Sequence, residues 1–321
     1  MKITSRSIPL LLFSYYNRTM QRILTFQSNE TESMRVDSFL LRQNLPRCSV
    51  KLLKKLQNHI YVNGKEVYVI ERVNPGDTVT VEFHEEIKDE DRLIPTELPL
   101  DIVYEDEDIL IVNKSADMSV HPVRTNLENT LANAVTYYYS ARGQNDFVFR
   151  CLNRLDRYTS GLTLIAKNAL SAQILSEDMK NRRIHRTYLG IAEGKLSEPI
   201  GIIDAPIARE TEEEIRRIVD FTRGQTAITE YEVLNYNAEA NVSLLRFQLK
   251  TGRTHQIRVH MNYLGYPLIG DILYNPENHL MERSALHAAM LEFTHPITRV
   301  AMVIKKDMPS DMSFFFPKFH F

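Results

Sequence analysis

The charged segment at residues 85–92 limits most strongly how this chain can fold, because it divides the 321 residues into two unequal parts. Its sequence, EEIKDEDR, has neither the apolar period of a helix nor the alternation of a strand, and Pro95 and Pro99 follow it. Such a stretch cannot bury an apolar face, so we assign residues 85–99 to a linker. Each part must then build its own hydrophobic core.

Residues 34–84, before the linker, are predicted to form a small α/β unit. An apolar period of 3.6 residues recurs on both sides of Ser49, a residue type that caps helices well, and this predicts two short helices. The Asn-Gly pair at residues 63–64 lies between β-forming residues and predicts a hairpin. The run TVTVEF at residues 78–83 predicts a last strand.

Residues 1–33 are expected to be an extension of this unit. Lys2 and Arg6 precede a short apolar run, as in a secretory signal, but no small-residue cleavage site follows, so we expect a cytoplasmic protein. No folding pattern precedes Met20, which is the alternative start of translation. No stretch approaches the roughly 20 apolar residues of a membrane span. The two cysteines are too few for a disulfide framework.

Positive charge is concentrated in the small unit, although the whole chain is nearly neutral. The formal net charge is -2 and the pI is near 6.6, so total charge gives no sign of a nucleic-acid partner. Between Met34 and Leu56, however, six basic residues stand against the single acid Asp37. This pattern is typical of a phosphate-binding surface, although basic residues on a surface helix are often only solvated. The six are Arg35, Arg42, Arg47, Lys51, Lys54 and Lys55.

Residues 100–321, after the linker, predict a larger α+β domain. Apolar strand runs at residues 109–112 and 162–166 alternate with helical segments such as residues 169–181. We expect a largely antiparallel sheet, with no internal repeat. Further strands are expected at residues 187–192, 227–234 and 243–250.

The first cluster with chemical potential is NRLDRYTSGLTLIAK, at residues 153–167. Asp156 lies between Arg154 and Arg157, and a carboxylate beside a cation has a lowered pKa and stays ionised at neutral pH. An ionised carboxylate can act as a nucleophile or a base. The alternative is a structural Arg–Asp pair at the edge of a strand.

The second cluster, KTGRTHQIRVHM at residues 250–261, is too polar for a core strand. Alternation along an exposed strand would place Arg253, His255 and Ile257 on one face and Gln256, Arg258 and His260 on the other. One face could then serve the structure while the other reaches a site. The two histidines are five residues apart, a spacing that suits one metal in neither a helix nor a strand, so we expect no metal site.

The third cluster, ALHAAMLEFTHP at residues 285–296, mixes histidine with small apolar residues. Taken alone, His287 is best interpreted as a core histidine with satisfied hydrogen bonds. A separate basic run at residues 180–183, KNRR, adds candidate phosphate contacts and ends on Arg183.

Five ordered segments resemble the successive motifs of the RluA family of pseudouridine synthases. The small unit also resembles the RNA-binding module of a ribosomal small-subunit protein, through MRVDSFLLRQNL and YVNGKEV…NPGDTVTV. Together the resemblance covers roughly residues 34–317. The sequence departs from the family at Asn153, where a histidine is usual, and at Lys114 to Asp117, where Lys-Pro-Ala-Gly is usual. The five segments are ILIVNKSADMSVHP, NRLDRYTSGLTLIAKN, HRTYLGIAEG, TGRTHQIRVHMNYLGYPLIGDILY and ALHAAMLEFTHP.

The resemblance implies an RNA pseudouridine synthase with a small RNA-binding module and a larger, mainly antiparallel catalytic domain. It implies that Asp156 attacks C1′ or removes the C2′ proton, that Arg258 is its ion-pair partner, and that Tyr188 stacks on the flipped uracil. It implies ribosomal or transfer RNA as the partner. The implied reaction requires no cofactor or metal. Our default expectation for the oligomeric state is a monomer. The residues expected to bind substrate are Arg154, Arg157, Arg183, Arg253, His255 and Gln256.

Two other functions are compatible with the same residues. The departures at Asn153 and Asp117 would suit a catalytically inactive RNA-binding or ribosome-assembly factor. A hydrolase acting on nucleosides through Asp156 would instead release free uracil. Mapping of pseudouridine and chromatography of the products separate these alternatives.

Overall fold

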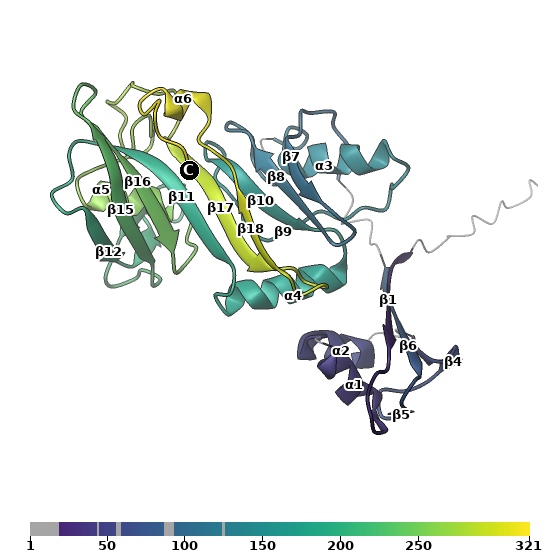
Figure 1. Cartoon of the computed structure of the whole chain (residues 1–321). Coiled ribbons are helices and arrows are strands. Elements are labelled where there is room, and N and C mark those ends of the chain that lie inside the picture. Colours follow the sequence, from purple (N-terminus) through teal and green to yellow (C-terminus); the bar gives the residue numbers. More distant parts are fainter. Residues whose placement is uncertain (1–18, 44, 56–58, 87–92, 124–125) are drawn as a thin grey trace, which may run out of the picture.

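The computed structural model describes residues 19–43, 45–55, 59–86, 93–123 and 126–321, which form a small N-terminal part and a large C-terminal domain (Figure 1). The small part contains a sheet with the strand order β1-β6-β3-β4, a second pair of strands, β2 and β5, and two helices. Val36, Phe39 and Leu40 are fully buried in its core, as their helical spacing predicts. Its elements are β1 (Thr19–Gln27), β2 (Met34–Arg35), α1 (Val36–Arg42), α2 (Arg47–Lys55), β3 (Ile60–Val62), β4 (Lys65–Glu66), β5 (Arg72–Val73) and β6 (Thr78–Glu86).

The predicted hairpin connects β3 and β4. Asn63 and Gly64 both have positive φ, 51° and 79°, and this is the backbone conformation that a two-residue turn between twisted strands needs. The two predicted helices are present as well.

Strand β1 contradicts the boundary expected at residue 34. It pairs antiparallel with β6 from Thr19 opposite Glu86 to Gln27 opposite Thr78, so residues 19–27 belong to the sheet of the small part. The reason is strand alternation, since Leu24 and Phe26 lie two residues apart and both pack on the same core. Strand β6 likewise runs two residues into the expected linker. The signal-like run before residue 19 lies outside the described residues.

The large domain is built on a mainly antiparallel sheet with the path β12-β15-β16-β11-β17-β10-β8-β7. Strands β18 and β9 pair with β17 and β10, and only the short β10–β17 pair is parallel among the pairs of this sheet. Strands are present at the expected residues 109–112, 162–166, 187–192, 227–234 and 243–250, and the predicted α+β class is confirmed. The strands are β7 (Ile102–Glu105), β8 (Ile109–Lys114), β9 (Arg150–Cys151), β10 (Ser160–Ala166), β11 (His185–Glu193), β12 (Ile200–Asp204), β15 (Ile228–Asn237), β16 (Val242–Leu249), β17 (Leu286–Thr294) and β18 (Ala301–Lys305). A separate hairpin joins β13 (Ile207–Arg209) to β14 (Arg217–Val219).

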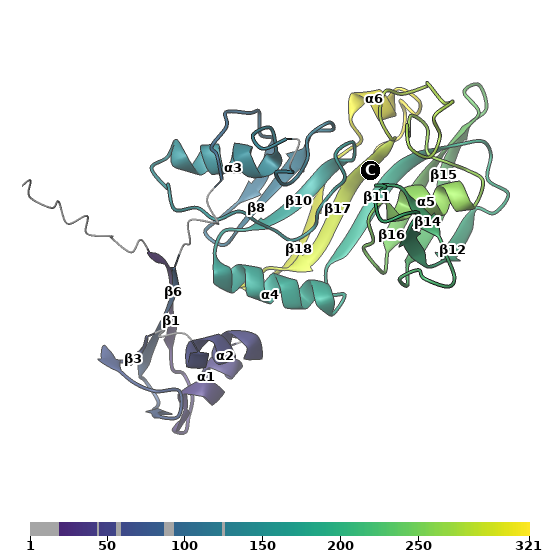
Figure 2. The same cartoon turned by 180° about the vertical axis from the view of Figure 1, so that it is seen from behind.

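Helices cover both faces of this sheet. Residues of α3 (Leu131–Ser140) and α5 (Gln256–Tyr263) share one core cluster, and Figure 2 shows both helices in front of the sheet. Residues of α4 (Ala169–Lys180) and α6 (Ser310–Ser313) join the clusters on the other side. No helix in the described part of the chain is long and apolar enough to cross a membrane.

Helix α5 corrects the strand expected at residues 253–260. The chain turns at His255, whose φ is 58°, and becomes helical from Gln256. Residues 256–261 are all buried and only Asn262 and Tyr263 at the end of the helix are exposed, so no polar face reveals the helical period. The polar side chains of this helix bond to protein groups in the interior. In the sequence alone, the same polar residues are typical of an exposed strand.

Candidate active site

Asp156 lies in the loop between β9 and β10, and buried Asn153 fixes the start of that loop. The amide nitrogen of Asn153 donates to the Leu162 carbonyl at 2.9 Å, and its oxygen accepts from the Leu164 amide at 2.7 Å. An amide side chain can donate and accept at once, which is what these two backbone groups of β10 require. The departure at Asn153 therefore keeps the loop attached to the sheet.

The other departure, Asp117, is also accommodated. Asp117 has a φ of 61°, a left-handed conformation that glycine adopts most easily and that aspartate tolerates. Its carboxylate accepts from Nε of Arg157 at 2.8 Å. Nζ of buried Lys114 donates to the Arg157 carbonyl at 3.0 Å and to the carbonyls of Ser115 and Met118. The loop before Asp117 is thus bonded to the loop that carries Asp156.

Arg258 connects Asp156 to a second, fully buried carboxylate. Nη1 of Arg258 lies 3.3 Å from Oδ2 of Asp156, while Nε and Nη2 donate to the two oxygens of Asp271 at 2.6 and 2.7 Å. Burial opposes the charge on Arg258, but its bonds to Asp271 and the charge of Asp156 raise its pKa above the ordinary value. The guanidinium is therefore a fixed cation, oriented by Asp271 toward Asp156.

His255 approaches Asp156 from another direction. Its Nε2 lies 3.9 Å from Oδ2 of Asp156, and its Nδ1 is 3.0 Å from the hydroxyl of Tyr274. Burial lowers the pKa of His255, which favours the neutral ring, although the charge of Asp156 opposes this shift. The carboxylate of Asp156 retains 28% side-chain exposure, so it remains accessible to a ligand.

Asp156, Tyr188 and Arg258 line a cavity of about 680 Å³. Tyr188, on β11, is only 5% exposed, and burial raises its pKa, with Arg186 opposing the shift and Asp156 adding to it. Asp156 is the only acidic residue in the lining, against seven basic ones. The cavity therefore suits an anionic ligand placed beside one carboxylate. The basic residues are Arg154, Lys180, Arg182, Arg186, Lys250, Arg253 and Arg258.

The cavity includes most of the residues predicted to bind substrate. Arg154, Arg253 and His255 line it together with Gln256. Gln256 is buried and bonds to Thr251, Thr229 and two backbone groups, so its amide holds the segment in place.

Arg157 and Arg183 are absent from the residues that line this cavity. Arg157 pairs with Asp117, and Arg183 donates to Asp178 at 2.8 Å. The sequence showed their charge but could not show which carboxylate each one would meet.

The basic residues of the small part are partly neutralised. Arg35 and Lys54 both pair with Asp37, at 2.8 and 3.3 Å, and Arg42 pairs with Glu30 at 2.6 Å. Lys51 is exposed, and Arg47 lines a small cavity between the two parts of the chain. The side chain of Lys55 lies outside the described part.

Sequence reasoning assigned no role to Asp271, Tyr274, Arg186 or Lys114. Asp271 lies in the quoted segment YPLIGDILY, but only the fold shows that it pairs with Arg258. Arg186 stands two residues before Tyr188, so strand alternation could have placed it on the same face. His287 is a buried histidine bonded to Ser160 and to the Lys306 carbonyl, as interpreted from the sequence.

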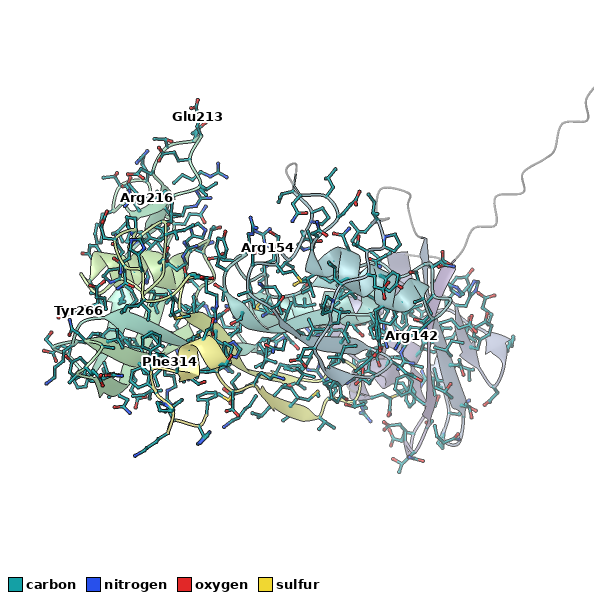
Figure 3. All side chains as sticks on the ribbon, turned by 90° about the horizontal axis from the view of Figure 1, so that it is seen from above. Arg142, Arg154, Glu213, Arg216, Tyr266 and Phe314 are labelled. Atoms are coloured by element: carbon teal, nitrogen blue, oxygen red, sulfur yellow. The ribbon has the colours of Figure 1, made fainter. Side chains whose placement is uncertain are left out.

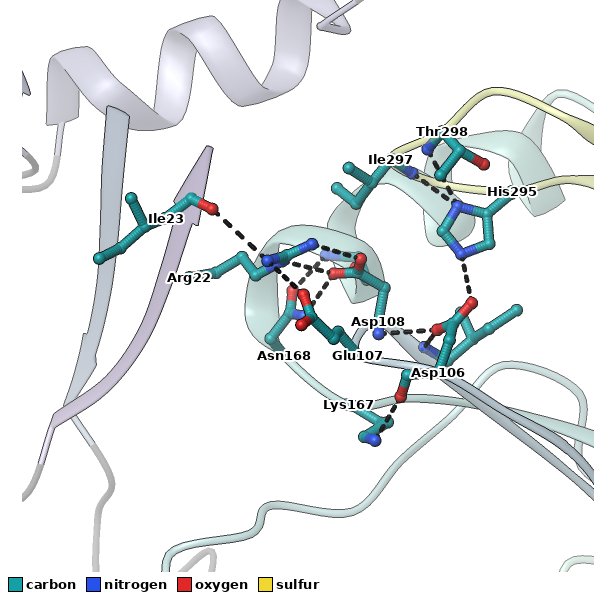
Figure 4. Close-up of polar contacts among 12 residues, drawn as sticks. Arg22, Ile23, Asp106, Glu107, Asp108, Lys167, Asn168, His295, Ile297 and Thr298 are labelled. Carbon is teal, nitrogen blue, oxygen red and sulfur yellow. Dashed lines mark hydrogen bonds and ion pairs between the residues drawn. The ribbon is translucent and has the colours of Figure 1, made fainter. Parts of the chain in front are cut away.

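One group of potential metal ligands occurs within the described ranges, away from this cavity. The side chains of Asp106, Asp108 and His295 converge, with ligand atoms within 4.8 Å of one another. Figure 4 shows that these atoms already bond to protein groups: Asp106 to His295 at 2.9 Å, and Asp108 to Arg22 at 2.8 Å. This group joins the two parts of the chain.

Comparisons with known proteins identify the family of this chain. The family model for RNA pseudouridylate synthase matches residues 108–263, which include Asp156, Tyr188 and Arg258. The chain is 41% identical over 253 residues to the RNA pseudouridine synthase YhcT of Bacillus subtilis (strain 168), covering 79% of this chain and 82% of that protein. It is 36% identical over 274 residues to the ribosomal large subunit pseudouridine synthase D of Escherichia coli (strain K12), covering 80% and 81%.

A solved structure agrees as well. Human RNA pseudouridylate synthase domain containing 1 superposes with a TM-score of 0.54 at 28% identity, covering 65% of this chain and 83% of that one. By both sequence and fold, the chain belongs to the RNA pseudouridine synthase family.

Proposed function

We propose that this enzyme isomerises uridine in large-subunit ribosomal RNA, with Asp156 as the essential carboxylate. The observation that carries the assignment is the single carboxylate of a basic cavity, held 3.3 Å from the fixed cation of Arg258. Hydrolytic glycosidases generally pair two carboxylates so that one of them can activate water. An isomerase instead needs one carboxylate and a site that retains the detached uracil until it is rejoined to the ribose.

The reaction breaks the bond between ribose C1′ and N1 of uracil, turns the base, and joins C5 to C1′. Asp156 either attacks C1′ or removes the C2′ proton, and its negative charge serves both routes. The proton lost from C5 is balanced by one gained at N1. Buried Tyr188 would stack on the flipped base and assist the proton transfer. Arg258, held by Asp271, would keep Asp156 charged and oriented.

The choice of ribosomal RNA rests on the named relatives. The relative from Escherichia coli is named as acting on the large ribosomal subunit, and transfer RNA is the other substrate to test. Arg154 and Arg253, at the cavity, would contact phosphates of this RNA. The N-terminal part would add contacts through Arg47 and Lys51. We expect the protein to be cytoplasmic. We also expect a monomer, and gel filtration of the purified protein would check this oligomeric state.

The test compares wild type with Asp156→Ala on ribosomal RNA transcripts. Wild type should form pseudouridine, detected as carbodiimide adducts, and Asp156→Ala should lose at least about a thousandfold in rate. Asp204→Asn, which removes an exposed carboxylate on β12, is the matched control and should retain activity. Formation of pseudouridine by Asp156→Ala as well as by wild type would refute the role of Asp156. Release of free uracil by the wild type would identify a hydrolase.

A further inference from the structure

His255 lies beside Asp156 with a backbone conformation that is uncommon for a residue with a side chain. Its φ is 58°, in the left-handed region, and it directly precedes α5. This conformation costs free energy in any residue that has a Cβ atom, and such residues are frequent at functional sites. The imidazole makes no bond that caps the helix, so the turn serves to place the ring beside Asp156 and Tyr274.

The hydroxyl of Tyr274 determines which ring nitrogen of His255 carries the proton. This hydroxyl accepts a hydrogen bond from the Arg217 amide at 2.9 Å, and it lies 3.0 Å from Nδ1 of His255. A hydroxyl has one proton to donate, and within the described ranges Nδ1 is the only acceptor at hydrogen-bond distance from it. Burial raises the pKa of Tyr274 to about 12, so the hydroxyl keeps that proton at neutral pH. Nδ1 therefore accepts, and the proton of the neutral ring is on Nε2.

The two oxygens of Asp156 have unequal surroundings. Nε2 of His255 lies 3.9 Å from Oδ2, and Nη1 of Arg258 lies 3.3 Å from the same oxygen. The other oxygen, Oδ1, has no hydrogen bond or ion pair with any residue that the structure describes. A distance of 3.9 Å is too long for a hydrogen bond, but bonds at reacting groups often close only when substrate binds. The protein thus holds Oδ2 and leaves Oδ1 to react.

Tyr274 is itself enclosed by other side chains. It is only 5% exposed, and its ring packs edge-on against His255 with ring centres 5.8 Å apart. The guanidinium groups of Arg258 and Arg216 lie 5.1 and 5.8 Å from the centre of the same ring. Figure 3 shows Arg216 toward the same edge of the molecule as Arg154 of the active-site cavity. A ring enclosed in this way acts on the reaction through His255 and Arg258.

The surroundings of His255 favour its neutral form. Burial lowers its pKa below the ordinary value of 6.5. The Tyr274 hydroxyl favours the same form, because a donor bonded to Nδ1 stabilises the neutral ring. Charged side chains also face the ring, two carboxylates that favour the imidazolium and two guanidinium groups that oppose it. They are Asp156, Asp271, Arg258 and Arg217.

We propose that His255 is a positioning residue for the reaction, because its Nε2–H group holds Oδ2 of Asp156 while Tyr274 keeps the ring in the required tautomer. Oδ1 is then the reacting oxygen. In one route the Oδ1–C1′ bond forms as the C1′–N1 bond breaks, and the electron pair of that bond leaves with uracil. In the other route Oδ1 takes the C2′ proton as the same C1′–N1 bond breaks. This inference rests on the proposed function, because it divides the work of the essential carboxylate between its two oxygens.

The test compares two amides at position 255 in steady-state assays on ribosomal RNA transcripts. The amide nitrogen of glutamine reaches the place of Nε2, whereas that of asparagine reaches only the place of Nδ1. His255→Gln should therefore keep most of the wild-type kcat, and His255→Asn should lose roughly 10- to 100-fold, with little change in KM for either variant. Asparagine adopts the left-handed conformation more easily, so His255→Asn should be the more stable variant. His279→Asn, which changes an exposed histidine, is the matched control and should behave as wild type.

Nitrogen NMR of the ¹⁵N-histidine-labelled protein reads the tautomer without turnover. The signal that is absent from His255→Gln belongs to His255, and in the wild type its proton should be on Nε2. The kcat of wild type should fall as the pH drops below 6.5, because the ring then gains a second proton. In Tyr274→Phe the neutral ring loses its donor, so the pKa of His255 should rise and this fall should move to higher pH. Tyr263→Phe, on the exposed end of α5, should keep the wild-type pH profile.

Three results would overturn the inference. The first is a proton on Nδ1 of His255 in the wild type, and the second is an equal kcat for His255→Gln and His255→Asn. The third is a kcat that follows stability, with His255→Asn the faster enzyme. The two variants at position 255 keep the inference falsifiable if Tyr274→Phe does not fold. Absence of pseudouridine with the wild type would instead count against the proposed function, and NMR would still decide the tautomer.

Discussion

Asp271 shows how a residue remote from the ligand can determine the geometry of the site. Its two oxygens accept from Arg258 and also from the amides of Leu273 and Tyr274, so the carboxylate is held from both sides. Its side chain has no exposure, and Arg258 has only 6%. A buried carboxylate of this kind fixes the direction of the guanidinium without touching the substrate.

Asp271→Asn should therefore lower kcat with little change in KM. The amide removes one acceptor and turns a donor toward Arg258, so the guanidinium would lose its alignment with Asp156. A misplacement of this size costs roughly 10- to 100-fold in rate. Single-turnover assays with saturating RNA would measure the loss, and Asp271→Glu should recover part of it. An unchanged kcat would exclude a positioning role.

At the level of single residues, the sequence predicted types of chemistry better than partnerships. Asp156, Tyr188 and Arg258 were found by motif, and the structure brings them to one cavity. Arg157 and Arg183 were chosen by charge, and each meets a carboxylate elsewhere. The partner of a charged residue depends on the fold of both segments, and no local pattern carries that information.

At the level of elements, the pairing of β10 with β17 depends on one glycine. Gly161 has a φ of 117°, and a Cβ atom there would lie 2.4 Å from the carbonyl oxygen of Ala288 on β17. Backbone atoms cannot move aside as a flexible side chain can, so any larger residue would push the two strands apart. The same strand follows the loop that carries Asp156.

Gly161→Ala should destabilise the protein severely, by roughly 3 kcal/mol or more, through overpacking and backbone strain. Gly143→Ala is the matched control, because Gly143 also has a positive φ, 79°, but no atom within 4 Å of the added Cβ. The control should cost only about 1–2 kcal/mol. Urea unfolding of both variants would measure the difference, and equal losses would show that close packing contributes nothing.

His287 on β17 gives this strand pair a dependence on pH. Its Nε2 donates to the Lys306 carbonyl and its Nδ1 accepts from the Ser160 hydroxyl on β10, an arrangement that needs the neutral ring. Burial lowers the pKa of His287 to about 4, whereas an unfolded histidine titrates near 6.5. Between these values the unfolded chain binds more protons, so stability falls as the pH falls from 6.5 toward 4.

His287→Gln should weaken that pH dependence. The full shift corresponds to about 3 kcal/mol, lost progressively on acidification below pH 6.5. The variant will have its own stability at neutral pH, so the informative quantity is the slope of unfolding free energy against pH. Urea titrations between pH 4 and 7 would give it. Parallel slopes for the two proteins would contradict the assignment.

The sequence predicted elements well wherever a continuous apolar run or a helical apolar period marks them. The helix at residues 169–181 and the strands at residues 109–112 and 162–166 were found within a few residues of their ends. Helix α5 is not evident from the sequence because residues 256–261 are all buried, so their polar side chains do not mark a solvent face. Residues 206–226 carry little sequence signal because their regular structure is limited to the short β13–β14 hairpin.

At the level of the whole molecule, the two parts of the chain are joined by contacts that no sequence pattern indicated. Arg22 on β1 bonds to both oxygens of buried Asp108, and Leu170 and Ile174 of α4 pack into the core of the small part. Figure 4 shows Arg22 reaching from β1 to Asp108 and Glu107. The bond from Arg22 to Asp108 joins residues 86 positions apart and depends on the assembled fold. The charged linker between the two parts does not predict this contact.

Arg22→Gln should loosen the small part from the large domain while leaving both folded. Asp108 would keep its bonds to Asn168 and Ser171, so the large domain should stay intact. A buried carboxylate without its cation is costly, so the junction is where the loss should appear. Small-angle X-ray scattering should show a larger radius of gyration, and limited proteolysis should cut faster within residues 85–99. Arg42→Gln, which breaks a pair inside the small part, should change neither measurement. If Arg22→Gln has the radius of gyration and the proteolysis rate of wild type, the apolar contacts with α4 alone hold the two parts together.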